Sequence, residues 1–155
     1  MIFATSQNHL LMASFGQLTK FLPGGSIEIL TRYLEHQRLA SGHVLWHEGD
    51  KSNSIAFVLT GKLELLKETS FPGRPFVLGL FSAGSLVGED SFLEDQSYQG
   101  TVRALEETEL LLLSRERFDT LNREQPELAN LLLKWLMNLL SARLRNTQGR
   151  LAAIF

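Results

Sequence analysis

The chain has 155 residues, of which 44% are hydrophobic and 21% are charged, and it contains no cysteine. This composition is typical of a compact globular domain that buries a sizeable core. The absence of cysteine excludes a disulfide framework, a thiolate metal site and a cysteine nucleophile. The formal net charge of −2 gives no overall attraction for nucleic acid or anionic membranes. We therefore expect no direct DNA binding and no membrane partner.

The N-terminal segment does not have the pattern of an export signal. It lacks a basic start, and the polar residues Ser6 to His9 interrupt its apolar stretch. No run of about 18 apolar residues occurs anywhere in the chain. The sequence therefore predicts no signal peptide, no membrane span and a cytoplasmic location.

A short helix is expected after the breaker Pro23-Gly24-Gly25. Ser26 is a candidate N-cap for this helix. Apolar residues then recur at helical spacing, at Ile27, Leu30 and Leu34. The pattern predicts a helix from about residue 27 to 36.

Residues 42–114 consist of short runs of β-branched and aromatic residues separated by turn residues. The candidate strands are residues 43–47, 54–59, 62–67, 76–81, 101–105 and 109–113. This spacing favours an antiparallel sandwich or barrel.

The spacing of apolar residues becomes helical again after Ser114, which is a candidate N-cap. Pro126 fits the first turn of a second helix that extends to about residue 146, with Gly149 as its stop signal. The sequence predicts one domain over residues 1–155, with the β core at about 40–114 and the C-terminal helices at about 115–146.

The last predicted helix has more apolar surface than one packing face requires. Its polar residues share one narrow stripe and are Glu127, Asn130, Lys134, Asn138, Ser141 and Arg145. Either the N-terminal residues cover the second apolar face, or that face joins two chains. Burial of a Leu side chain contributes about 1.5 to 3 kcal/mol, so a few Leu pairs suffice for a dimer. We expect a homodimer through residues 126–146.

The order of the turns and strands resembles the cyclic-nucleotide-binding domain family of the catabolite activator protein and the protein kinase A regulatory subunit. The resemblance covers about residues 15–146 and rests on Glu48-Gly49-Asp50, Thr60-Gly61, Gly88-Glu89 and Thr101–Ala104, followed by two helices. It implies a mainly β, antiparallel jelly roll with short N-terminal helices and two C-terminal helices. It also implies a non-catalytic regulatory domain that senses a cAMP- or cGMP-like ligand and passes the signal through its C-terminal helices.

The resemblance places a phosphate-binding cassette at residues 88–102. In the family, a Glu holds a ribose hydroxyl and an Arg binds the cyclic phosphate. The positions implied for ligand contact are Gly88, Glu89, Tyr98, Gln99, Gly100 and Thr101. Tyr98, or Gln99 in a register shifted by one, falls on the arginine position, and neither is a cation. Loss of a charge-assisted hydrogen bond costs about 1.5 to 3 kcal/mol of binding free energy.

Two arginines outside the arginine position are candidates to replace the missing charge. Arg103 is expected on the same strand face as Thr101, although it also fits a solvated strand position. Arg143 falls where the activator's helix carries a hydroxyl group, although the helix dipole alone explains a cation there. Four carboxylates in the cassette oppose an anion, namely Glu89, Asp90, Glu94 and Asp95.

Two functions therefore remain open. The domain either senses a cyclic nucleotide, or it has a degenerate cassette that binds none and serves as a dimerisation module, an interaction module or a sensor of another small ligand. Tyr98 would hydrogen-bond a ligand, stack on a base or fill the pocket. The protein partner is unknown.

An enzyme is not expected. The four histidines all precede residue 48, the spacing of a cupin metal site is absent, and no Gly-x-Ser-x-Gly elbow occurs. Haem binding would have to use one of these histidines. Few residues follow Asn146, so we expect no helix-turn-helix module. The sequence predicts no metal and no cofactor.

Overall fold

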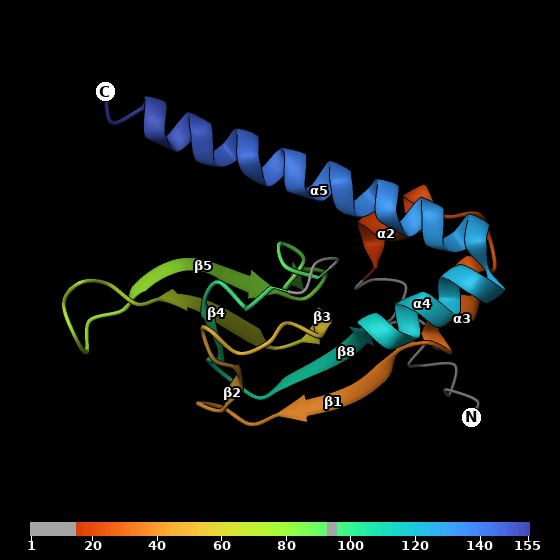
Figure 1. The fold of residues 1–155 in the computed structure, drawn as a ribbon, viewed down its shortest axis with the longest axis horizontal. Coiled ribbons are helices and arrows are strands. Elements are labelled where there is room, and N and C mark those ends of the chain that lie inside the picture. Colours follow the sequence, from red (N-terminus) through yellow and green to blue (C-terminus); the bar gives the residue numbers. More distant parts are fainter. Residues whose placement is uncertain (1–14, 93–95) are drawn as a thin grey trace.

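The computed structural model describes residues 15–92 and 96–155. The short helices α2 (Gly16–Phe21) and α3 (Ser26–Thr31) precede the strands, and α4 (Arg115–Glu124) and α5 (Pro126–Ala152) follow them (Figure 1). The strands form two four-stranded sheets in which every pairing is antiparallel. The predicted fold class, an antiparallel β jelly roll with helical ends, is confirmed.

The first sheet has the strand order β1-β8-β3-β6, and the second has the order β2-β7-β4-β5. The strands of the first sheet are β1 (Glu35–Leu39), β8 (Thr108–Ser114), β3 (Ser54–Thr60) and β6 (Leu86–Val87). Those of the second are β2 (Val44–Trp46), β7 (Thr101–Ala104), β4 (Lys62–Lys67) and β5 (Phe76–Ser82). The inner faces of both sheets contribute to one apolar cluster that includes Val58, Leu63, Val102 and Leu110.

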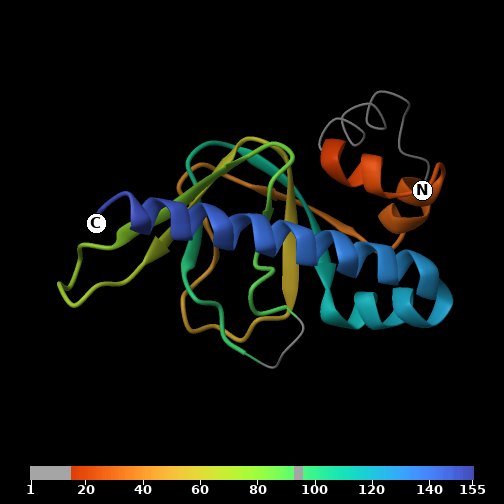
Figure 2. The same ribbon diagram turned by 90° about the horizontal axis from the view of Figure 1, so that it is seen from above.

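A second apolar cluster joins the helices to the other face of the first sheet. Phe57 of β3 belongs to this cluster. The Phe15 ring packs edge-on against the Phe57 ring, with 5.0 Å between the ring centres, and the Trp135 ring stacks on it, with 6.1 Å between the centres. Leu18 of α2 and Leu132 of α5 belong to the same cluster. Figure 2 shows that α5 crosses the β core lengthwise, with α2 and α3 beside its first turns.

The helix predicted at residues 27–36 is shorter than expected, which corrects two details of the sequence interpretation. Residues 35–39 form β1, which pairs with β8 from Glu35 opposite Leu112 to Leu39 opposite Thr108. This pairing is non-local, so the helical spacing of neighbouring residues does not report it. Gly25, with a φ of 83°, occupies the N-cap position instead of Ser26, which is the first helical residue.

The predicted starts of the C-terminal helices are confirmed, but the predicted end of α5 is wrong. The Ser114 hydroxyl accepts a hydrogen bond from the Arg117 N–H at 3.1 Å, and Pro126 begins α5. The helix passes through Gly149 and ends at Ala152. One glycine costs a helix about 1 kcal/mol relative to alanine, which is too little to end it where its neighbours favour helix.

The two halves of α5 have different surroundings. In the first half, residues 126–136, the side chains of Leu128, Leu132 and Leu136 are buried in the cluster that includes Phe15 and Leu18. The N-terminal residues thus cover this half. In the distal half, residues 137–152, Met137 is 70% exposed, and Leu140, Leu144 and Leu151 are also exposed. The free apolar surface therefore lies nearer the C-terminal end of α5 than the sequence indicated.

Two searches of the described residues gave negative results. No helix in residues 15–92 or 96–155 is both long and apolar enough to cross a bilayer. Within the same residues, no group of three or more His, Asp or Glu side chains is placed to hold a metal ion. The segment on which the absence of a signal peptide was predicted lies mostly outside the described residues.

Candidate ligand-binding site

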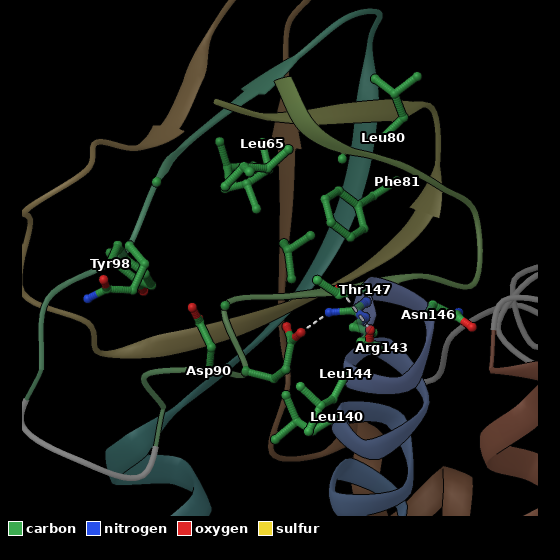
Figure 3. Close-up of a pocket in the computed structure, with 18 of the residues that line it drawn as sticks. Leu65, Leu80, Phe81, Asp90, Tyr98, Leu140, Arg143, Leu144, Asn146 and Thr147 are labelled. Carbon is green, nitrogen blue, oxygen red and sulfur yellow. Dashed lines mark hydrogen bonds and ion pairs between the residues drawn. The ribbon is translucent and has the colours of Figure 1, made fainter. Parts of the chain in front are cut away.

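A cavity of about 510 Å³ lies between the cassette, β5 and the distal half of α5 (Figure 3). Its apolar lining comes from β4, β5 and α5 and includes Leu65, Leu80, Phe81, Leu140 and Leu144. Most predicted site residues line it as well, namely Gly88, Glu89, Tyr98, Gln99, Gly100 and Arg143. Thr101 and Arg103 are not among its lining residues.

Tyr98 fills the inner end of the cassette. Its side chain is 4% exposed, and its ring stacks on that of Trp46 at 4.1 Å with 2° between the planes. Its hydroxyl donates to the Ser54 carbonyl at 2.9 Å and accepts from the Ser54 N–H at 3.2 Å. The hydroxyl is thus bound to β3, and the ring lies where the family resemblance implies an arginine.

The backbone around Tyr98 holds this side chain in place. Its N–H donates to the Asp50 carbonyl at 2.8 Å, and its carbonyl accepts from the Gly49 N–H at 2.9 Å. Trp46 and Tyr98 also line a second cavity of about 400 Å³ on the side of β3. The stacked rings therefore form part of the wall between the two cavities.

Gly88 is required by the position of Trp46. It has a φ of 87°, and a Cβ at this position would lie 3.0 Å from the Trp46 ring. A Cβ at Gly100 would lie 2.7 Å from Leu65 Cδ1. The two glycines let the cassette backbone approach the second sheet closely. The Gly-Glu signal is therefore explained by packing as well as by ligand binding.

Glu89 is bound to α5. Its carboxylate is 7% exposed and forms an ion pair with the guanidinium of Arg143. Arg143 Nη2 also donates to the Leu86 carbonyl at 2.6 Å, and the guanidinium lies 5.3 Å from the Phe81 ring centre. Burial lowers the pKa of Arg143. The carboxylate that the resemblance assigns to a ribose hydroxyl thus connects the cassette to α5.

The other predicted site residues have partners near the rim or outside the cavity. The Gln99 amide donates to the Ser97 carbonyl at 3.1 Å. The Thr101 hydroxyl accepts from the Glu48 N–H at 3.0 Å. Arg103 Nε donates to Glu64 Oε1 of β4 at 2.8 Å, so the structure does not bring Arg103 into the cavity.

Sequence reasoning missed several residues of the site. Trp46 lies in an ordinary apolar strand and carries no local signal. Asn146 lines the cavity at the predicted end of the last helix, and Thr147 and Arg150 line it beyond that end. An extended helix would have revealed them, since residues 143, 147 and 150 share one helical face.

The charges of the site do not favour a cyclic phosphate held in the family manner. Residues 88–102 contain no Lys or Arg. Of the two arginines that line the cavity, the half-buried Arg143 is already paired with Glu89, and Arg150 lies near the end of α5. Asp90 adds a second carboxylate to the lining. Glu94 and Asp95 lie outside the described residues. The site is thus a cavity with a mixed polar and apolar lining, in which a tyrosine occupies the position of the phosphate-binding arginine.

The protein is thus an antiparallel jelly-roll domain with a Gly-Glu loop at a cavity and a long C-terminal helix over that cavity. Residues 36–125 match the model of the cyclic nucleotide-binding domain. The chain belongs to this family, and the resemblance seen in the sequence is confirmed.

Solved structures have the same fold. A cyclic nucleotide-binding domain from Methylobacillus flagellatus kt aligns with a TM-score of 0.83 and 22% identity over 97% of this chain and 86% of its own. The catabolite activator protein of Thermus thermophilus aligns with a TM-score of 0.72 and 29% identity over 86% of this chain and 60% of its own. The first likeness concerns the fold alone.

Curated relatives are much longer proteins. Lysophospholipase nte1 of Neurospora crassa is 35% identical over 83% of this chain, and lysophospholipase NTE1 of Chaetomium globosum is 32% identical over 88% of it. The chain spans about 8% of the length of each of these relatives.

Proposed function

We propose that this chain is a non-catalytic regulatory domain of the cyclic-nucleotide-binding type that works without a cyclic nucleotide. The observation that carries the proposal is the buried Tyr98 ring, stacked on Trp46 and hydrogen-bonded to Ser54 at the position of the phosphate-binding arginine. A cyclic phosphate there would have to displace an aromatic side chain and would meet no cation in its place. The Tyr98 side chain thus occupies the space in which the cyclic phosphate would bind.

The ion pair between Glu89 and Arg143 supports the same proposal. In a ligand-dependent domain, occupancy of the cassette repositions the C-terminal helix. Here a side chain of α5 already binds the cassette carboxylate and the Leu86 carbonyl. Since these contacts are internal to the chain, α5 is held over the cavity whether or not a ligand is present.

The partner that we propose is a catalytic unit acting on lysophospholipids. The support is the similarity to proteins named lysophospholipase, of which a domain of this size is a small part. Regulation would pass through α5, because its distal half exposes apolar side chains such as Met137 and Leu144.

We also propose a homodimer through the distal half of α5. Its exposed apolar residues alternate at spacings of three and four, as in the a and d positions of a coiled coil. They are Met137, Leu140, Leu144 and Leu151, and Ile154 follows just after the helix. Leu140 and Leu144 are partly exposed and also line the cavity. Thr147 is the one polar residue at this spacing between Leu144 and Leu151.

A cyclic-nucleotide sensor is the second candidate, and the size of the cavity favours it. Its volume of about 510 Å³ lies within the range of small-molecule sites, about 300 to 1,000 Å³. A ligand in this cavity would meet Glu89 once Arg143 was displaced.

Titration calorimetry on nucleotide-stripped protein separates the two candidates. We expect no heat with cAMP, cGMP or a cyclic dinucleotide up to about millimolar concentration. The variant Tyr98→Arg restores the cation in the same chain and serves as the matched comparison. Micromolar binding by the unmodified chain would support the sensor and reject the proposal.

A further inference from the structure

The connection between β4 and β5 presents two aromatic side chains to solvent. Phe71 is 70% exposed and Phe76 is 62% exposed, and Arg74 lies between them in the sequence. On β5, the side chain of Val77 is exposed as well, whereas the partly exposed Leu78 and Leu80 line the cavity. We call residues 69–76 the hairpin tip. Neighbouring apolar side chains that are exposed in this way indicate an interaction site.

The exposure of these rings is part of a defined turn. The Thr69 hydroxyl donates to the Arg74 carbonyl at 2.9 Å and accepts from the Phe71 N–H at 3.2 Å. The Arg74 N–H donates to the Phe71 carbonyl at 3.2 Å, and Gly73 has a φ of 76°. Because these bonds and two prolines fix the backbone, the rings are held away from the core.

Charge is distributed unevenly around this end of the molecule. Residues 69–88 contain Arg74 and no Asp or Glu, and residues 128–155 contain four cations and no Asp or Glu, the cations being Lys134, Arg143, Arg145 and Arg150. The hairpin tip and the C-terminal end of α5 lie at the same end of the long axis (Figures 1 and 2). The hairpin tip and the distal half of α5 thus carry more cations than carboxylates, although Glu68 and Glu48 lie at the base of the hairpin tip.

The shape and chemistry of the hairpin tip fit a lipid surface. A protein partner of standard size buries about 800 Å² on each side, which requires a broad face, whereas the hairpin tip is narrow and protrudes from the sheet (Figure 1). Aromatic rings beside a cation match the boundary between acyl chains and anionic headgroups. We propose that the hairpin tip inserts Phe71 and Phe76 into the surface of an anionic bilayer, with Arg74 at the headgroups. This contact does not depend on what the cassette binds.

Co-sedimentation of the full chain with lipid vesicles tests the proposal. The probes are vesicles of phosphatidylcholine alone and of phosphatidylcholine mixed with phosphatidylserine. We expect binding to the mixed vesicles, and a loss of at least about tenfold in partition when Phe71→Ser and Phe76→Ser are combined. Arg74→Ser should weaken binding to mixed vesicles about fivefold and leave binding to phosphatidylcholine unchanged.

The matched control is Leu105→Ser, which removes an apolar residue that is 41% exposed in the turn between β7 and β8. It should bind vesicles as the unmodified chain does, and all variants should keep the same urea midpoint.

As a second readout, Trp fluorescence of Phe76→Trp should be quenched by brominated lipid. The proposal is wrong if the unmodified chain stays in solution or if the double variant sediments equally well. Loss of self-association in the double variant, without vesicle binding, would assign the hairpin tip to a protein interface.

Discussion

Tyr33 and Tyr98 carry the same hydroxyl group in opposite surroundings. The Tyr98 hydroxyl is bound to Ser54 within the β core, whereas the Tyr33 hydroxyl donates to Glu124 at the exposed surface at 2.7 Å. A buried hydrogen bond contributes more than an exposed one because its loss leaves an acceptor without water. The two tyrosines therefore provide a matched pair of substitutions.

We expect Tyr98→Phe to lower the free energy of unfolding by about 1 to 2 kcal/mol and Tyr33→Phe to lower it by about 0.5 kcal/mol or less. Urea denaturation of both variants measures the difference. Equal effects would mean that the Tyr98 hydroxyl faces solvent in the cavity.

The ion pair of Arg143 is a second residue-scale feature with a measurable effect. Arg143→Met leaves the buried Glu89 carboxylate without its partner, so we expect a loss of stability on the order of 3 kcal/mol. Adding Glu89→Gln should recover part of this loss, because a neutral amide is less costly to bury. Arg38→Met, which breaks an exposed pair with Glu109, should cost about 1 kcal/mol or less. A similar loss of stability in Arg143→Met and Arg38→Met would contradict a stabilising ion pair between Arg143 and Glu89.

For the site residues, the sequence identified which residues lie near the cavity better than it identified where their side chains point. The resemblance to the family implied that Gly88, Glu89 and Tyr98 belong to one ligand-contacting loop, and all three line the cavity. The sequence could not tell that Tyr98 points to β3, because its partners Trp46 and Ser54 are more than forty positions away. Arg103 was assigned to the site from strand alternation alone, and its partner Glu64 on the adjacent strand explains why it lies outside the cavity.

At the scale of elements, α5 differs most from the expectation. The sequence predicts a stop at Gly149 because glycine often follows the last helical residue, but the helix continues for three more residues to Ala152. Nothing lies within 4 Å of a Cβ built at this position. Helix length is therefore set by residues on both sides of the glycine, which a search for stop signals does not weigh.

We expect Gly149→Ala to raise the free energy of unfolding by about 0.5 to 1 kcal/mol, because alanine favours an exposed helix interior. Far-UV circular dichroism should show equal or greater helicity. If the helix instead ended at Gly149 in the left-handed conformation, alanine would destabilise the chain.

The strand β1 shows the other limit of sequence reasoning. Residues 35–39 are mostly exposed and begin only three residues after α3, and neither burial alternation nor a Gly or Pro turn signal separates them from the helix. Their strand conformation depends on hydrogen bonds to β8, which lies at the far end of the β core in sequence. The apolar runs 54–59 and 62–67 were predicted closely, because β-branched and other apolar residues bounded by turn residues indicate a strand locally.

At the scale of the whole molecule, the proposed dimer rests on the distal half of α5. We expect sedimentation equilibrium to give a two-chain mass at about 100 μM, since several buried apolar pairs are sufficient for association at this concentration. Met137→Glu, which changes an outward residue that does not line the cavity, should produce a monomer. Lys134→Glu lies on the polar stripe and should leave the mass unchanged. A monomeric unmodified chain would reject the dimer.

The central claim, that α5 is held over the cassette without a nucleotide, is tested most directly by hydrogen exchange. The account predicts that amides of residues 86–92 and 137–146 are protected in nucleotide-free protein and that about millimolar cAMP leaves their exchange unchanged. Arg143→Met should increase their exchange. Protection that develops only when cAMP is added would contradict the account.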